Sequence, residues 1–522
     1  MKVLVAEPMA AAGVALLKAQ PGWDVVVSNP KEYSQHLGDC EALIVRSAVK
    51  VNAAVIAQAP KLRVIGRAGV GVDNVELAAA TAAGILLMNT PGGNAVSVAE
   101  HTIALMLSLV RSIPQASASS KAGKWEKKKF MGTELRGKTL GIVGLGSVGR
   151  QVARRARAFE MRIVAYDPFV NTQTAKASDV DLLDLPELYE QSDFITLHTA
   201  LTPQSKKMLS KAAFDLMKPG VRIVNCARGE LIDEAALLEA MQSGKVAGAA
   251  LDVFEKEPPD PADPLLAIDS FIATPHIGGS TEEAQETVGI RIAEQIVEYL
   301  QNGVAQNAVN MPALTPEQYR TVGPYIILAE RLGSFASHIA TGNPRNVRLT
   351  YYGKIAEQNT TIVRNAGLAG VLNRSLAHKA NAVSAVQIAG DRGLNFAEQH
   401  EGRVAHMDSI RLDLETDQGT TSVEGAVVLD KARLIQVDGI SCEAPLDGNL
   451  IFLKNEDVPG VIGYIGGVLG RNGINIATFS LGRRQAGAEA VSVVATDQPV
   501  PDAVLSGLLE NPAVKVARAV SL

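Results

Sequence analysis

The sequence is poor in several features, and each scarcity excludes a class of protein. Only three cysteines occur among 522 residues, and Cys40, Cys226 and Cys442 are too far apart for a paired metal motif or a disulfide framework. The 50 basic residues are nearly balanced by 55 acidic ones, which gives a formal net charge of −5. A slightly negative chain is a poor general binder of nucleic acid. We therefore expect a protein of a reducing compartment with no nucleic-acid partner and no metal site.

Long hydrophobic runs are scarce as well. Residues 77–99 carry no charge, but Pro91, Gly92 and Gly93 break this stretch, so it does not predict a membrane span. The chain opens directly on a strand-like run at 2–6, without a basic segment or cleavage site before it. With 47% hydrophobic and 20% charged residues, the composition is typical of soluble globular proteins. We expect a cytoplasmic protein of about three or four domains with no membrane partner.

The first segment alternates helical patterns with short apolar runs, which predict four buried parallel strands at 3–6, 42–45, 63–66 and 85–88. Two arginines, Arg46 and Arg67, stand at strand ends. In open α/β sheets the carboxyl ends of the strands face the ligand crevice. Because guanidinium groups pair with carboxylate or phosphate, the two arginines together indicate an anionic substrate. Taken alone, either one could be an ordinary solvated surface residue.

The most informative motif lies at 140–153, where an apolar run leads into Gly144, Gly146 and Gly149 and then into helix-compatible sequence. A second apolar run follows and ends at Asp167. Strand, G-x-G-x-x-G turn, helix, strand and acid form the dinucleotide-binding fingerprint of a Rossmann-type unit. The glycines let backbone N–H groups approach a pyrophosphate at the helix N-terminus. Asp167 would bind the ribose hydroxyls and repel a 2′-phosphate, which favours NAD over NADP.

Ionisable residues follow three later strand ends, and we assign Arg228, Glu257 and His276 to catalysis. Oxidation of a 2-hydroxy acid needs a base for the hydroxyl proton, and histidine titrates near neutral pH. Glu257 can orient the ring and stabilise its charged form, while Arg228 can hold the substrate carboxylate. Taken singly, His276 could be a buried strand-end histidine and Glu257 a turn acid. Three complementary groups beside a cofactor unit favour the catalytic interpretation.

These motifs together resemble the D-isomer-specific 2-hydroxyacid dehydrogenases. The resemblance is carried by the dinucleotide fingerprint with 166–168 and by segments 66–74, 225–229, 252–257 and 274–279. Over all 522 residues the chain is similar to the long-form phosphoglycerate dehydrogenases of this family. That resemblance implies oxidation of 3-phosphoglycerate to 3-phosphohydroxypyruvate with NAD, the first step of L-serine biosynthesis. It also implies an NAD-binding Rossmann lobe at 94–282 inserted into a flavodoxin-like substrate lobe made of 1–93 and 283–311.

The resemblance implies roles for further positions. Those on the substrate side are Arg46, Ser47, Arg67 and Asn94. Those on the cofactor side are Val70, Gly144, Gly146, Ser147, Val148, Gly149, Asp167, Thr199, Cys226, Ala227, Asp252, Gly278 and Gly279. Position 147 is serine where some relatives have arginine, which puts one pyrophosphate contact in doubt.

From about residue 312 the composition shifts, and no nucleophile, metal or phosphate motif is present. We expect a helix at 324–339 and a hairpin over 425–439. The resemblance implies an α+β intervening domain at 312–446, which in relatives joins subunits and takes anionic effectors; Lys431 and Arg433 are weak candidates for such contacts.

The last segment, 447–522, shows a βαββαβ order with a Pro-Gly loop and resembles a ferredoxin-like ACT domain. Asp457 and Asn475 match positions where that family binds amino-acid effectors across a dimer interface. The resemblance thus implies a homodimer or homotetramer and L-serine as a possible effector, although some members do not respond to serine.

Other functions stay open at this point. Glycerate, lactate or erythronate 4-phosphate are rival substrates for the same catalytic lobe. The fold also serves as an NADH-sensing corepressor, but such proteins lack the two appended C-terminal domains.

Overall fold

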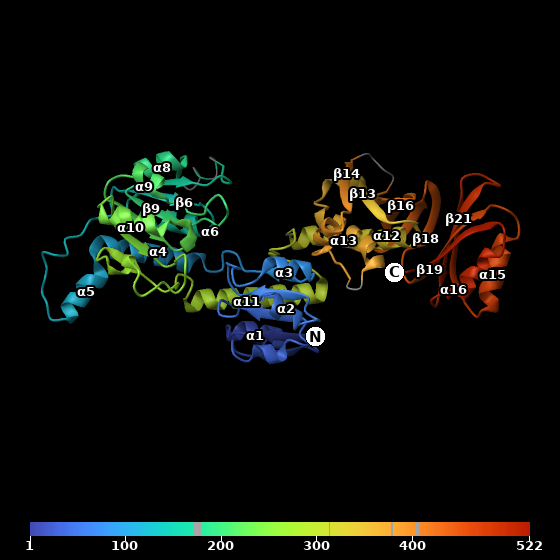
Figure 1. The fold of residues 1–522 in the computed structure, drawn as a ribbon, viewed down its shortest axis with the longest axis horizontal. Helices are drawn as coiled ribbons and strands as arrows, with labels where there is room; N and C mark the ends of the chain where they lie inside the picture. The colour runs from blue at the N-terminus through green and yellow to red at the C-terminus, as the bar shows by residue number, and fades with distance from the viewer. Residues whose placement is uncertain (172, 174, 176–178, 313, 377–378, 403–406) are drawn as a thin grey trace.

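The computed structural model describes residues 1–171, 173, 175, 179–312, 314–376, 379–402 and 407–522. Four β-sheets follow one another along the chain, each covered by helices (Figure 1). The molecule is elongated: the second sheet lies at one end and the fourth at the other, with the first and third between them.

The first sheet is parallel with the order β2-β1-β3-β4-β5, the flavodoxin-like order. Its strands are β1 (Lys2–Val5), β2 (Asp24–Val27), β3 (Ala42–Val45), β4 (Val64–Arg67) and β5 (Leu86–Met88), joined by α1 (Ala11–Lys18), α2 (Ala53–Ala57) and α3 (Leu77–Ala82). The four predicted strands are confirmed because each apolar run is buried. The sequence did not predict β2, which lies at the edge and alternates only weakly between exposed and half-buried positions.

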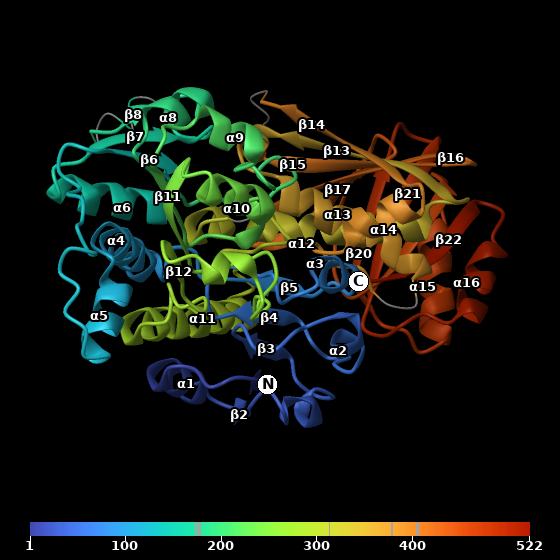
Figure 2. The same cartoon turned by 60° about the vertical axis from the view of Figure 1, so that its left-hand side comes forward.

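Helix α11 (Glu282–Asn302) follows the second sheet in sequence but packs on the first (Figure 2). Gly13 of α1 lies so close to α11 that a Cβ there would be 2.5 Å from the Gly289 carbonyl oxygen. Ile292 of α11 lies against Gly66 of β4. The chain therefore leaves the first lobe, builds a second one and returns, as the predicted fold class requires.

The second sheet is parallel, and its order is β12-β11-β10-β9-β6-β7-β8. Its strands are β6 (Thr139–Val143), β7 (Arg162–Tyr166), β8 (Asp181–Leu182), β9 (Phe194–Leu197), β10 (Val221–Asn225), β11 (Val246–Leu251) and β12 (Phe271–Ala273). Helices α4 (Ala95–Arg111), α5 (Ile113–Lys121), α6 (Ser147–Ala158), α8 (Leu185–Gln191), α9 (Lys211–Leu216) and α10 (Glu234–Gln242) surround it. The strand order reverses between β6 and β9, and a crevice at such a point is where open α/β sheets bind their ligands.

Helix α4 ends at Arg111, and the chain bends sharply there. Ser112 has a left-handed backbone with φ 46°, and α5 starts immediately afterwards with a proline in its first turn. Proline cannot continue the preceding helix, so the chain bends by 62°. Within the part of the chain that the structure describes, no single helix is long and apolar enough to cross a membrane. Only α4 and α5 taken together reach that length and apolar composition, and they are bent relative to each other.

The third sheet is mixed, with the order β14-β13-β15-β16-β17-β18. Its elements are α12 (Pro316–Ile339), β13 (Pro344–Tyr352), α13 (Thr361–Leu372), α14 (Ala385–Asp391), β14 (Asn395–Glu401), β15 (Ser409–Thr416), β16 (Gly419–Val428), β17 (Lys431–Val437) and β18 (Ile440–Pro445). The predicted hairpin is confirmed as β16 and β17. The predicted helix starts eight residues before Pro324, because Thr315 and Gln318 form a capping box and the proline is accommodated inside the helix.

The fourth sheet is antiparallel, with the order β20-β21-β19-β22. Its elements follow the predicted βαββαβ order: β19 (Asn449–Glu456), α15 (Val461–Arg471), β20 (Ile476–Arg483), β21 (Glu489–Thr496), α16 (Asp502–Leu509) and β22 (Val514–Ser521). One face of this sheet packs on α15 and α16.

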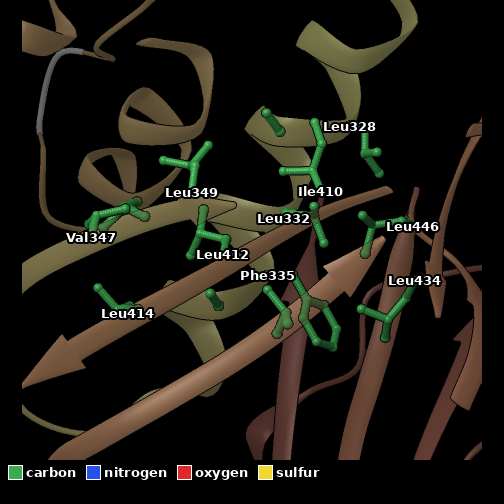
Figure 3. Close-up of a cluster of buried hydrophobic side chains, with 14 of the residues drawn as sticks. Leu328, Leu332, Phe335, Val347, Leu349, Ile410, Leu412, Leu414, Leu434 and Leu446 are labelled. Carbon is green, nitrogen blue, oxygen red and sulfur yellow. The ribbon is translucent and has the colours of Figure 1, made fainter. Parts of the chain in front are cut away.

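The other face of the fourth sheet shares a hydrophobic core with the third. Figure 3 shows this core, where Leu332 and Phe335 of α12 meet strand residues such as Leu412. Phe452 of β19 joins it and makes an edge-to-face contact with Phe335, with ring centroids 5.9 Å apart. On the opposite side, the Asn381 side chain donates a 2.8 Å hydrogen bond to the carbonyl of Gly84, which ties this unit to the first lobe.

Candidate active site

The glycine turn after β6 forms an open cradle at the crevice. Gly144 has φ 95°, and a Cβ there would lie 2.5 Å from the carbonyl oxygen of His198 on the neighbouring strand end. Gly149 packs against the Gly144 carbonyl, which brings α6 close to the strand. Beside Gly146, which is the N-cap residue of α6, there is open space. Free backbone N–H groups facing such a space fit a pyrophosphate.

Asp167 stands at the end of β7 beside this cradle. One carboxylate oxygen accepts a 2.8 Å hydrogen bond from the N–H of Leu145, and the other accepts one of 2.9 Å from Phe169. These bonds hold the half-buried carboxylate next to the glycine turn. The cradle and the acid together fit NAD, with Asp167 on the ribose side.

The structure brings His276 and Glu257 into contact. His276 Nδ1 lies 2.8 Å from Glu257 Oε2, and the two side chains are 53% and 38% exposed. Glu257 Oε1 also accepts a hydrogen bond of 3.2 Å from the N–H of Phe254, which orients the carboxylate. Since Nδ1 is engaged by the carboxylate, Nε2 is the ring nitrogen left for a substrate proton.

Arg228 reaches across the crevice to the first lobe. Its Nη2 lies 2.9 Å from Asp73 Oδ2, and its Nη1 donates to the carbonyl of Ala227 at 2.7 Å. The fully buried Asn225 shapes the loop, because its side chain bonds the N–H of Ala227 and the carbonyl of Arg228. Gly71 lies directly against the Arg228 guanidinium, so a side chain there would displace it.

Arg67 and Arg46 complete a group of three guanidinium groups. The pKa of Arg67 is lowered, first by burial and then by the positive charge of the nearby Arg228. The positive charge of Arg46 also lowers it. Arg67 Nε is buried and has no hydrogen-bond partner among the residues that the structure describes. Glu7, only 5% exposed, accepts hydrogen bonds from the N–H groups of Arg46 and Val49 and so fixes the loop after β3. An orphaned buried donor among three cations suits an anionic ligand.

The remaining predicted positions have individual surroundings. Ser47 is exposed next to Arg46, and the Val70 carbonyl accepts a 2.5 Å hydrogen bond from Asn89. Ser147 and Val148 form the first turn of α6, and Thr199 lies against Gly144. Burial raises the pKa of the Cys226 thiol to about 12, so this cysteine stays protonated at neutral pH.

The loop after β12 carries Gly278 and Gly279 as well as His276. The 1% exposed Asp252 bonds the N–H of Gly278 at 2.8 Å, and Asn94 lies against Gly279. In this structure the Asp252 carboxylate therefore binds the backbone of the loop after β12.

The two predicted effector positions do not meet within one chain. Asp457 Oδ2 pairs with Arg483 Nη1 at 2.7 Å, at the end of β20, whereas Asn475 precedes β20 and bonds Asp497. The pKa of Asp457 is lowered by its bond to Arg483 and next by the N–H of Gly487. At about 3.3 Å a residue, the length of β20 separates the two positions by about 25 Å.

Sequence reasoning missed Glu7, Asp73 and Asn225, which hold the predicted residues in place. Glu7 follows β1 directly and Asn225 ends β10, so their positions at strand ends were the available signal. Asp73 lies in a loop, and its pairing with Arg228, 155 residues away, follows only from how the lobes approach each other.

Comparisons with known proteins agree with this geometry. Residues 103–278 match the model of the NAD-binding domain of D-isomer specific 2-hydroxyacid dehydrogenases, 321–438 the D-3-phosphoglycerate dehydrogenase intervening domain, and 449–509 the ACT domain. The chain is 42% identical to D-3-phosphoglycerate dehydrogenase of Methanocaldococcus jannaschii over 100% of both chains, and 44% identical to that of Archaeoglobus fulgidus over 96% of both. A structure of NAD-dependent formate dehydrogenase from Staphylococcus aureus in complex with NAD is 28% identical, with a TM-score of 0.52, covering 59% of this chain and 98% of that one. The chain is thus an NAD-dependent dehydrogenase, and it belongs to the D-3-phosphoglycerate dehydrogenases of the D-isomer-specific 2-hydroxyacid dehydrogenase family.

Proposed function

We propose that this chain oxidises 3-phosphoglycerate to 3-phosphohydroxypyruvate with NAD, the first step of L-serine biosynthesis. The observation that carries the proposal is the buried Arg67 Nε, which has no hydrogen-bond partner among the described residues and lies near other guanidinium groups, Arg228 first. A phosphorylated hydroxy acid brings a carboxylate and a phosphate, and three guanidinium groups match both.

His276 is the base in this proposal and removes the C2 hydroxyl proton at Nε2. Glu257 holds Nδ1 and stabilises the imidazolium that forms, as a carboxylate 2.8 Å away can do. NAD, which the glycine cradle and Asp167 would hold, would supply the acceptor for the C2 hydride. Arg228 holds the substrate carboxylate beside His276, whereas Arg46 and Arg67, on the first lobe, take the phosphate.

A panel of hydroxy acids, assayed for NADH formation at 340 nm, tests the substrate. We expect 3-phosphoglycerate to have the highest kcat/KM. Arg67→Lys is expected to lower that value by about tenfold or more, because lysine cannot make a bidentate contact, and to change it much less for glycerate, which lacks the phosphate. A higher kcat/KM for glycerate, lactate or erythronate 4-phosphate would refute the proposal.

We also propose that the chain works in the cytoplasm as a homodimer or homotetramer with the domain boundaries given above. Asp457 and Asn475 lie at opposite ends of β20, so an effector that touches both needs two copies of the chain. The proposed effector is L-serine. Initial rates with millimolar L-serine test it, and an unchanged rate at saturation would remove it.

A further inference from the structure

The loop that carries His276 depends on hydrogen bonds for its shape. His276 has a left-handed backbone with φ 54°, which a non-glycine residue adopts only when its surroundings hold it there. Its side chain is half exposed and touches Glu257. Few packing contacts therefore fix the ring, and the backbone on either side of it must do so.

Asp252 anchors this loop at four points. Its Oδ1 accepts from the Thr274 hydroxyl at 2.5 Å and from the N–H of Ile277 at 2.9 Å, and its Oδ2 accepts from Gly278 at 2.8 Å. Its backbone carbonyl accepts from the N–H of His276 at 2.9 Å. Thr274 and Gly278 flank His276, so the carboxylate holds both sides of the loop.

A second histidine closes this network from α4. His101 Nε2 lies 3.1 Å from Thr274 Oγ1 and 3.3 Å from Asp252 Oδ1, and its side chain is 18% exposed. Burial by itself raises the pKa of Asp252. Its hydrogen bonds, first the one with His101, lower the pKa by more than burial raises it, so the pKa lies below its usual value and Asp252 is ionised. An ionised carboxylate only accepts, and the Thr274 hydroxyl already donates its proton to it. Both neighbours of Nε2 are therefore acceptors, and Nε2 must carry the proton.

The same face of the N-terminal part of α4 touches the returning chain at three points. Asn94 lies against Gly279, Ser97 Oγ is 2.7 Å from Thr281 Oγ1, and His101 reaches Thr274. Spacings of three and four residues place these side chains on one side of a helix. Helix α4 thus aligns the whole segment that leads from β12 into α11.

We propose that His101 is a positioning residue for the acid/base step: its Nε2–H holds Thr274 and Asp252, and through them the loop that sets His276 against Glu257. The proposal rests on the role proposed above for His276. This role differs from packing of the ring, because it requires a hydrogen-bond donor at the position of Nε2.

Two variants of the full-length chain separate donation from packing. In His101→Leu the donor is lost, and we expect kcat to fall about tenfold to a hundredfold, with the KM for NAD changed by less than about threefold. In His101→Gln an amide N–H₂ replaces Nε2–H, and kcat should return to within about threefold of the parent. Glu100→Gln, an exposed change on the same helix, is the matched control and should leave kcat unchanged.

Amide hydrogen exchange gives a readout that needs no substrate. The N–H groups of His276, Ile277 and Gly278 should exchange about tenfold faster in His101→Leu than in the parent or in His101→Gln, while α4 keeps its protection. Thr274→Val, which leaves α4 intact, should loosen the same amides.

The proposal is overturned if His101→Leu folds and leaves both kcat and loop exchange as in the parent, or if His101→Gln is as impaired as His101→Leu. It is also overturned if the loop loosens without loss of kcat. Lack of turnover of 3-phosphoglycerate by the parent would refute the proposed function, whereas the exchange of the loop would still report on His101.

Discussion

Truncating Phe452 should destabilise two structural units at once. Phe452 belongs to β19 of the fourth sheet, but it is 1% exposed and lies in the core around α12, edge-to-face with Phe335. Loss of a buried phenylalanine side chain costs about 3–5 kcal/mol, part of it from the aromatic pair. Because a domain is stabilised by only about 5–15 kcal/mol, Phe452→Ala should remove a large share of the stability.

The shared core determines which structural units lose stability. Leu450 and Phe452 of the fourth sheet contribute to the same cluster as Leu332 and Phe335 of α12. If this cluster is one cooperative unit, the third and fourth sheets must unfold together. Both Phe452→Ala and the parent chain should then show one C-terminal transition, shifted to lower urea in the variant.

Hydrogen exchange in increasing urea measures whether the third and fourth sheets unfold in one transition, with peptides from α13 and α15 as reporters. Tryptophan emission does not, because Trp23 and the 88% exposed Trp125 both lie outside the C-terminal units. Lys515→Ala, which breaks an exposed ion pair with Glu456 and an exposed hydrogen bond to the Pro512 carbonyl, is the control and should change the free energy of unfolding by less than about 1 kcal/mol. A transition of α15 that moves while that of α13 stays in place would refute the reasoning.

Three further outcomes are expected. His276→Ala should lower kcat by about a hundredfold or more, because the base is lost, with NADH affinity measured by its fluorescence changed less than about threefold. Asp167→Asn should raise the ratio of kcat/KM for NADP over NAD by about tenfold or more, since like-charge repulsion of a 2′-phosphate costs several kcal/mol; an unchanged ratio would contradict the role of Asp167. The lowered pKa of Asp252 means that its contribution to stability is present above its ordinary pKa of about 3.9 and is lost as the pH falls through the lowered value. Urea unfolding from pH 6 to pH 3 should accordingly show a shallower acid loss of stability in Asp252→Asn than in the parent.

The parallel sheets could be predicted because their strands are buried on both faces. Continuous apolar runs such as Leu140 to Val143 identify such strands, and the glycine turn locates the cofactor cradle. Edge strands such as β2 lack this signal, since half of their side chains face solvent. The start of α12 was missed because a proline normally ends a helix, and the capping box at Thr315 decided otherwise.

The contact between His276 and Glu257 could be predicted for a similar reason, whereas the residues that support the proposed site could not. Strand ends of one parallel sheet meet at one edge, so the separation of Glu257 and His276 in sequence did not hide their contact. Asp73 contacts Arg228 from a loop of the other lobe, and His101 contacts Thr274, near His276, from a helix. Such contacts depend on how the lobes and the helix pack, which no local pattern encodes.

The glycine cradle alone cannot specify the reaction. Its contacts come from backbone N–H groups and from Asp167, which face the dinucleotide whatever the substrate is. The choice of substrate must therefore come from groups that the cofactor does not need, and we propose that those groups are the guanidinium side chains. Arg46 and Arg67 belong to the first lobe and Arg228 to the second, with Asp73 joining them across the crevice. If all three hold the substrate, as proposed, the anion site is complete only when the lobes face each other. Insertion of one lobe into the other would then make substrate recognition depend on how the lobes approach.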